Sequence, residues 1–316
     1  LLSAAKVPML MMSDAYLDKL ASRLEIAVRD AVAHLEPFDR LGRSKARVER
    51  VASARRILKD GKILTRYSST GKAPELAAEP EGDIDDEVRT ITFARGSKPL
   101  VRLHYYATHP QTFCCDGRVT ADFVGAARGR LEKDEGIPQV YFTGGGGNVT
   151  VGKYNTGTDA ERHALAERLY TALKASAAST VYRPVRNIEW KYEDLQLPAR
   201  SDGADYQNVE PGQAAYRAAL RAAFAARKRA LPASALQLDD VAILHLPGEP
   251  LLEFQRFAQQ AGSGKFVAFA GYGDISPGYL CPDETLRQGG YEPSASNAAA
   301  GSEARIKDVI RKLLGR

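Results

Sequence analysis

Apolar and polar residues alternate with a helical period over residues 14–35, and Asp14 is a suitable first residue for that helix. The apolar positions of this segment are Leu17, Leu20, Leu24, Val28 and Val32. Residues 45–67 have no regular period and are expected to be extended and irregular. The next segment, 68–87, is rich in Ala, Pro, Glu and Asp and is expected to form a surface loop.

Beyond residue 87, short apolar runs alternate with longer segments of helical period. The predicted strands are 88–94, 99–107, 138–143, 185–196, 241–246 and 265–270. The predicted helices are 120–133, 158–178, 211–229, 250–261 and 302–314. This alternation predicts an α/β fold, with a layered mixed sheet or sheets flanked by helices. Functional loops are expected at the carboxyl ends of the strands.

Composition and charge narrow the classes of protein to which the chain can belong. Hydrophobic residues make up 44% and charged residues 26%, a mixture typical of a globular protein. No apolar run reaches the roughly 18 residues needed to span a bilayer, and Lys6 and Pro8 interrupt the apolar first segment. The net charge is +5, but basic and acidic residues are interleaved and no aromatic-basic stripe is present. No nucleic-acid partner is expected.

The cysteine pattern says little about chemistry and slightly more about compartment. Cys114, Cys115 and Cys281 are an odd number without regular spacing, which is not typical of a disulfide framework or a zinc site. This usage favours a reducing, cytoplasmic compartment slightly over secretion, and both stay open.

Four predicted strands end in polar or glycine-rich segments. These segments are Thr108-His109-Pro110 after 99–107, Gly144 to Asn148 after 138–143, Pro247-Gly248-Glu249-Pro250 after 241–246, and Gly271 to Tyr279 after 265–270. If the strand ends meet in one crevice, an imidazole, a carboxylate and a phenol there suit a zinc ion with an open position for water. The glycines would let the backbone approach a ligand where a Cβ would clash.

Each of these residues also has a structural interpretation. A histidine at a strand end is often a satisfied structural residue, Glu249 can cap the helix after it, and Tyr279 can be a core aromatic. Ser276 could be a nucleophile in a turn, but its segment is not a G-x-S-x-G elbow and no histidine is nearby. The glycine run is not a phosphate loop, because no Gly-Lys-Ser/Thr follows it.

Taken together and in order, these motifs resemble the neutral/alkaline non-lysosomal ceramidase family. The matching segments are THP at 108–110, VTADFVG at 119–125, FTGGGGNVT at 142–150, LPGEP at 246–250, and GYGDISPGYLCP with GGYEP within 271–293. The resemblance runs from about residue 14 to about residue 293. It implies that residues 1–316 form a single ceramidase-like catalytic domain, without the C-terminal immunoglobulin-like domain of true ceramidases.

The resemblance also implies a catalytic Zn²⁺ held by two histidines, a glutamate and a tyrosine. His109 matches the second histidine, Glu249 the glutamate and Tyr279 the tyrosine. Tyr291 matches a further tyrosine that orients the substrate and supports the developing oxyanion. The family has a substrate-contacting arginine, which Arg56 matches slightly better than Arg55.

The glycine loop departs from the family pattern although it occupies the expected place. Gly146, Gly147, Asn148 and Thr150 are the expected substrate contacts. Family members usually read G-D-x-S/N-P here, so this chain lacks the acid and has Thr150 where ceramidases have a serine.

A His-x-His motif, which in the family supplies one zinc ligand and the proposed general base, is expected before residues 14–35 and does not occur. A truncated, cleaved or separate N-terminal segment is therefore expected to supply it.

The predicted function is hydrolysis of an amide bond by zinc-activated water. The substrate would be a small-molecule or lipid-like N-acyl amine, such as a ceramide-like sphingolipid. A zinc esterase or lactone hydrolase on the same scaffold is one alternative, because ester and amide hydrolysis share their intermediate. A non-catalytic remnant that has lost the first histidine pair is the other. A homo-oligomer is compatible with each of these functions.

Overall fold

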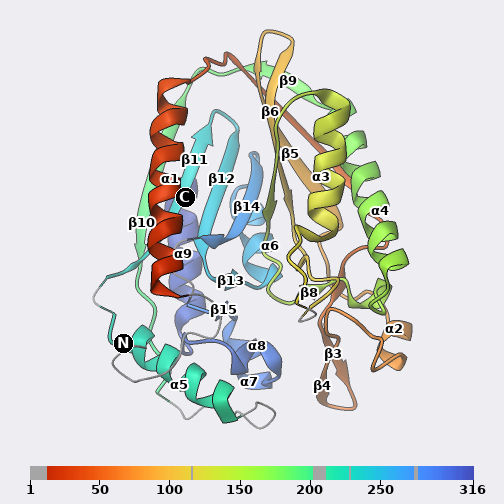
Figure 1. Cartoon of the computed structure of the whole chain (residues 1–316). Coiled ribbons are helices and arrows are strands. Elements are labelled where there is room, and N and C mark those ends of the chain that lie inside the picture. Colours follow the sequence, from red (N-terminus) through yellow and green to blue (C-terminus); the bar gives the residue numbers. More distant parts are fainter. Residues whose placement is uncertain (1–12, 115–116, 202–210, 228, 274–276) are drawn as a thin grey trace.

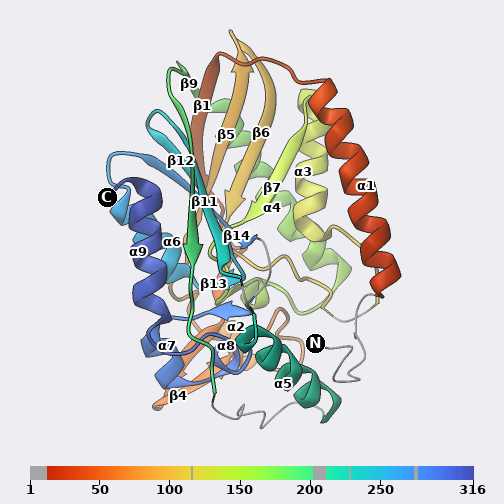
Figure 2. The ribbon, with the colours of Figure 1, turned by 90° about the vertical axis from the view of Figure 1, so that its left-hand side faces the viewer.

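The computed structural model describes residues 13–114, 117–201, 211–227, 229–273 and 277–316. Two mixed sheets stand face to face and helices cover the outer face of each, so the protein has four layers (Figures 1 and 2). The predicted α/β fold, with mixed sheets flanked by helices, is confirmed.

The first sheet has the strand order β7-β6-β5-β1-β9. Its strands are β1 (Arg40–Arg47), β5 (Glu87–Arg95), β6 (Lys98–Tyr106), β7 (Gln139–Thr143) and β9 (Val181–Pro184). Strands β6 and β7 are parallel and the other neighbours are antiparallel. Helices α3 (Asp122–Glu135) and α4 (Asp159–Ala178) pack on its outer face, where Leu131 and Leu169 join one apolar cluster.

The second sheet has the strand order β10-β11-β12-β14. Its strands are β10 (Ile188–Leu195), β11 (Leu231–Leu238), β12 (Val241–Pro247) and β14 (Phe266–Gly273), and only β12 and β14 are parallel. Helices α6 (Leu252–Ala261) and α9 (Ser302–Leu314) cover its outer face. The inner faces of the two sheets meet in an apolar cluster that joins Ile91 and Tyr105 to Ile243 and Ala268.

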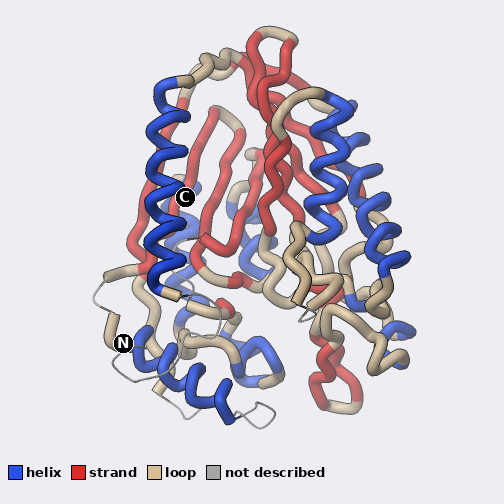
Figure 3. The backbone as a smooth tube through the Cα atoms, viewed as in Figure 1, coloured by secondary structure: helices blue, strands red, loops and turns tan. Residues whose placement is uncertain are grey.

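Short elements and loops gather at one end of the sandwich, the lower end in Figure 3. The short strands are β2 (Ser53–Ala54), β3 (Arg56–Lys59), β4 (Lys62–Thr65), β8 (Val149–Thr150), β13 (Glu249–Pro250) and β15 (Tyr279–Leu280). The remaining helices are α1 (Asp14–Ala33), α2 (Glu75–Ala78), α5 (Pro211–Ala225), α7 (Asp283–Gln288), α8 (Tyr291–Ser294) and the 3₁₀ turn η1 (Gly152–Tyr154).

The connections explain why functional segments gather at this end. Strands β6 and β7 are parallel neighbours joined through α3, and β12 and β14 are parallel neighbours joined through α6. Strand β14 also contacts β6 and β7, so the two parallel pairs lie at facing edges of the sheets. Their carboxyl ends therefore open on a shared region, the usual place for a site in α/β folds.

Local sequence signals account for several helix ends. Helix α4 begins with a capping box in which the Thr158 hydroxyl and the Glu161 carboxylate each accept a backbone N–H of the other residue. Helices α3 and α9 end at Gly136 and Gly315, which have φ of 66° and 73°, the left-handed conformation that glycine adopts without strain.

Some features of the fold differ from the expectations. Strands β1 and β11 were not predicted, and the segment 68–87 is not simply a surface loop, because it contains α2 and buries Thr70 and Asp85. Helix α1 forms as expected, but none of its residues is buried and Val28 on its apolar face is 60% exposed. No helix in the described part of the chain is long and apolar enough to cross a membrane.

Candidate metal centre

His109 follows β6 and is held in one orientation by backbone carbonyls. Its side chain is buried, and Nδ1 lies 2.7 Å from the Gly146 carbonyl oxygen and 3.0 Å from that of Val149. Carbonyl oxygens can only accept hydrogen bonds, so we assign the Nδ1 proton from this network. In the neutral ring, Nε2 then carries the lone pair that a metal ion would bind.

Three oxygen atoms converge on Nε2 of His109. The Glu249 carboxylate oxygen and the Tyr272 hydroxyl each lie 3.0 Å from it, and the Tyr279 hydroxyl lies 3.5 Å from it. A ring nitrogen lone pair and a carboxylate oxygen are both acceptors, so a proton or a metal cation must lie between them. Ligand atoms around tetrahedral zinc are roughly 3.3–3.5 Å apart. The 3.5 Å separation matches this spacing and the two 3.0 Å separations are shorter, so the donor set could hold a zinc ion after a small outward shift of the ligands.

The chemistry of this donor set is unusual for zinc. The described residues contain no group of three or more His, Cys, Asp or Glu side chains that could hold a metal ion. The cluster instead combines one imidazole, one carboxylate and two phenols, so phenol oxygen would have to act as a ligand.

Glu249 and Tyr279 meet because two short strands pair in register. Strand β13 runs parallel to β15, and Glu249 is the direct partner of Tyr279. Gly248 turns the chain from β12 into β13 with φ of 68°, and a Cβ there would lie 2.6 Å from the Gly278 carbonyl oxygen. Helix α6 begins at Leu252, whose N–H donates to the Asn148 side chain. Glu249 is therefore not the helix cap that its sequence position also allowed.

Arg55 reaches the cluster and Arg56 does not. The buried Arg55 guanidinium donates to the Tyr279 hydroxyl at 2.9 Å and to the Gly147 carbonyl at 3.1 Å. Arg56 instead donates to Glu292 at 3.0 Å and to Gln288 at 3.2 Å. Arg55 is therefore the arginine that contacts the cluster, and the contact of Arg56 or Arg55 with a substrate stays a prediction.

Burial and neighbouring charges shift the pKa values of Arg55 and Tyr279 beside the cluster. Burial opposes the charge on Arg55, but the nearby Tyr279 and the buried Glu292, 3.8 Å away, raise the Arg55 pKa above its ordinary value. Burial also raises the pKa of Tyr279, and the positive charge of Arg55 opposes this rise. A cation at the cluster would favour the phenolate further.

Tyr291, at the start of α8, lies one ring away from the cluster. Its ring packs edge-on against that of Tyr279, with centroids 5.7 Å apart, and Arg55 lies 5.3 Å from its centroid. On the other side it packs edge-on against Tyr67 at 5.8 Å. The rings of Tyr279, Tyr291 and Tyr67 thus form a row in which each contacts the next, from the cluster to the exposed Tyr67.

The glycine loop supports the cluster through its backbone. A Cβ on Gly146 would lie 3.0 Å from the backbone of Thr108, and one on Gly147 would lie 2.7 Å from the Glu249 carbonyl oxygen. The glycines thus allow the segments that carry His109 and Glu249 to approach each other. Direct contact of this loop with a substrate, Asn148 and Thr150 included, stays a prediction.

Tyr272 is the residue of the cluster that the sequence did not identify. It lies in the segment 271–279, in which the motifs indicated Tyr279 and Ser276 as candidate residues. Ser276 lies outside the described residues.

His104 illustrates the structural role that a strand histidine can have. It is buried between Thr90 and Gln139, and burial lowers its pKa to about 4.

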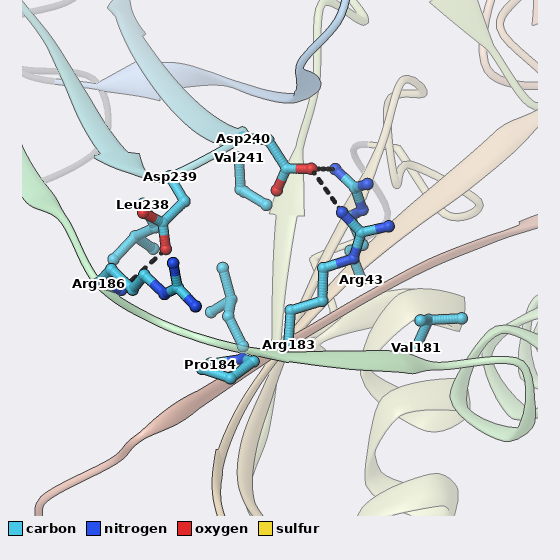
Figure 4. Close-up of a pocket in the computed structure, with 10 residues that line it drawn as sticks. Arg43, Val181, Arg183, Pro184, Arg186, Leu238, Asp239, Asp240 and Val241 are labelled. Atoms are coloured by element: carbon cyan, nitrogen blue, oxygen red, sulfur yellow. Dashed lines mark hydrogen bonds and ion pairs between the residues drawn. The ribbon is translucent and has the colours of Figure 1, made fainter.

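A separate hollow lies at the opposite end of β12 (Figure 4). It encloses about 380 Å³ beside the β11–β12 turn. Two of its arginines face one acid, because Asp240 pairs with Arg43 at 2.6 Å and with Arg183 at 3.4 Å. Since Glu249 follows the other end of β12, this hollow is distinct from the His109 cluster.

Fold and cluster together define an α/β layered protein with a candidate metal centre at the carboxyl ends of its strands. No protein-family model and no curated protein sequence matches the chain. Two solved structures share its fold, so the ceramidase-like fold that the motifs predicted is confirmed.

One is the crystal structure of neutral ceramidase from Pseudomonas aeruginosa, with a TM-score of 0.65 and 14% identity over 91% of this chain and 53% of that one. The other is a ceramidase complexed with C2, with a TM-score of 0.65 and 13% identity over 87% of this chain and 53% of that one. The chain thus spans about half the length of these proteins.

Proposed function

We propose that this chain forms the catalytic domain of a zinc-dependent hydrolase that cleaves the amide bond of an N-acyl amine. His109, Glu249 and Tyr279 would hold Zn²⁺. The observation that carries the proposal is the convergence of the Glu249 carboxylate and the Tyr279 hydroxyl on Nε2 of His109, at 3.0 and 3.5 Å, where a metal cation could take the place of a proton between the two acceptors. The ceramidase-like fold supports an amide of ceramide-like chemistry as the substrate class.

Bound zinc would supply an activated water and polarise the substrate carbonyl. The chain's own residues would do the rest. Backbone carbonyls hold the His109 ring, Arg55 donates to the Tyr279 oxygen, and Tyr291, whose ring contacts that of Tyr279, would donate to the developing oxyanion. A general base would accept the proton of the attacking water and then return it to the leaving amine, and we do not assign this role to any of these residues.

A hollow beside Tyr67 offers space for part of a substrate. It encloses about 530 Å³, with Leu76, Ala73 and Lys72 among its lining residues. Tyr67, the last ring of the row that leads from the cluster, lines this hollow and contacts Tyr291. Its size suits one substituent of an amide, such as a short acyl chain. An ester or lactone with the same substituent would fit equally well.

Zinc analysis and chelation test the proposal. We expect the protein to bind one zinc per intact active site, more weakly without a His-x-His segment, and the intact site to hydrolyse members of a panel of N-acyl amines, N-acyl amino acids and aryl esters. A chelator should abolish hydrolysis and added zinc should restore it. Hydrolysis that persists in zinc-free, chelator-treated protein would contradict the proposal, and the panel separates amide from ester cleavage.

A mechanism with a side-chain hydroxyl as the nucleophile, instead of metal-bound water, can be tested at Thr150. Its hydroxyl is buried and has no hydrogen-bond partner among the described residues, so nothing activates it as a nucleophile. We expect Thr150→Val to keep turnover within about threefold, because a methyl group replaces an unsatisfied buried hydroxyl. Phosphonates that label active-site serines should leave the protein unmodified. Stoichiometric labelling at Thr150 with loss of activity would overturn the metal-dependent mechanism.

A further inference from the structure

Tyr272 has a backbone conformation that a bulky side chain rarely adopts. Its φ is 61°, in the left-handed region, although the residue carries an aromatic ring. Its N–H donates to the Gly248 carbonyl oxygen at 2.6 Å, so the bend is tied to the turn that leads into β13. A strained conformation persists only where surrounding contacts fix it, and such residues concentrate at functional sites.

The left-handed backbone at Tyr272 brings its side chain against His109 and Glu249. Its ring stands at 87° to that of His109, with centroids 5.9 Å apart, and its hydroxyl lies 3.0 Å from Nε2. A Glu249 carboxylate oxygen lies at the same distance, 3.0 Å, from this nitrogen, so the hydroxyl and the carboxylate are neighbours at one point. The residue as a whole is 42% exposed, so it forms an accessible wall of the cluster.

Tyr272 and Tyr279 are not equivalent in their partners. The Tyr279 oxygen accepts a hydrogen bond from Arg55, which suits a negatively charged ligand oxygen. No cationic side chain among the described residues donates to the Tyr272 hydroxyl, and two acceptors lie beside it, Nε2 of His109 and the carboxylate of Glu249. Once a metal ion uses the Nε2 lone pair, the carboxylate is the acceptor that remains.

We infer that Tyr272 is a positioning residue of the metal centre, whose hydroxyl donates to Glu249 and fixes the carboxylate toward the metal. This inference rests on the proposed function, because it assumes a cation between His109 and Glu249. Residues that orient a ligating carboxylate in this way contribute substantially to metal affinity. The strained backbone is the structural cost of placing the hydroxyl there.

Two substitutions distinguish the effect of the Tyr272 hydroxyl from that of the strained backbone. Tyr272→Phe removes the hydroxyl and keeps the ring and the strained backbone, and we expect zinc affinity to fall about 10- to 100-fold. Tyr272→Gly removes the whole side chain at a φ that glycine tolerates. It should weaken zinc binding at least as much, while the Tm of the metal-free protein stays level or rises by about 2 °C. Tyr182→Phe, on β9 and away from the cluster, is the matched control and should bind zinc as wild type does.

The measurements are zinc Kd by competition with a chromophoric chelator, the visible absorption of the Co²⁺-substituted protein, and Tm of the metal-free protein. A Tyr272→Phe protein with wild-type Kd and an unchanged cobalt spectrum would overturn the inference. A lower Tm without a change in Kd would give Tyr272 a merely structural role and overturn it too. If wild type and Tyr182→Phe both fail to bind zinc, the proposed function itself fails.

Discussion

His109→Ala is expected to abolish zinc binding and to reduce hydrolysis by about 1000-fold or more, because a metal ion supplies several kcal/mol of transition-state stabilisation. The ring contributes the one nitrogen donor of the cluster, and its Nδ1 is already engaged by the Gly146 and Val149 carbonyls. No other described residue can place a nitrogen lone pair at the same point, since the other three groups there are oxygens.

Removal of a buried ring can also perturb folding, so Glu249→Gln is the companion variant. It preserves the side-chain volume and removes the negative charge, and its amide can donate to Nε2 of His109. We expect zinc binding and activity to be lost while the Tm of the metal-free protein does not fall. His34→Ala, at the exposed end of α1, is the histidine control and should keep both properties. Zinc bound stoichiometrically by both site variants would contradict the assignment.

The sequence could predict that His109 and Glu249 lie together because each follows a strand with a clear apolar pattern. His109 and Glu249 come directly after β6 and β12, and parallel strands that cross over through a helix bring such ends together. Strands β1 and β11 have weaker signals. In β11, small residues such as Ala233, Ser234 and Ala235 alternate in burial, but they have low strand propensity.

Which of Arg55 and Arg56 faces the cluster depends on local backbone geometry that composition does not encode. The two residues are adjacent, and neighbouring side chains in extended backbone point to opposite sides. Arg55 therefore faces Tyr279 while Arg56 faces Gln288 and Glu292. The segment 45–67 has no regular apolar alternation from which the inward side could be inferred.

Tyr272 and α1 show two further features that the pattern of apolar and polar residues cannot predict. A left-handed φ at a tyrosine has no sequence signature, because the strain is imposed by contacts with the Gly248 turn. The period of α1 predicted a helix correctly, but periodicity shows only that an apolar face exists. It does not show what covers that face, and here Leu24 and Val28 remain exposed.

Tyr291→Phe is expected to lower kcat about 100- to 1000-fold with little change in KM, the loss typical of a single oxyanion donor. The ring should stay in place, because its contacts with Tyr279, Tyr67 and Arg55 do not involve the hydroxyl. Zinc affinity should therefore remain that of wild type, in contrast to Tyr272→Phe.

Steady-state kinetics on one amide substrate, with zinc content measured on the same samples, distinguish the two tyrosines. A loss confined to kcat assigns the Tyr291 hydroxyl to the transition state, since uniform binding would change KM instead. Wild-type kcat in Tyr291→Phe would make Tyr291 a structural residue that packs between Tyr67 and Tyr279. Arg55 would then be the remaining buried donor beside the cluster, because its Nη1 already reaches the Tyr279 oxygen at 2.9 Å.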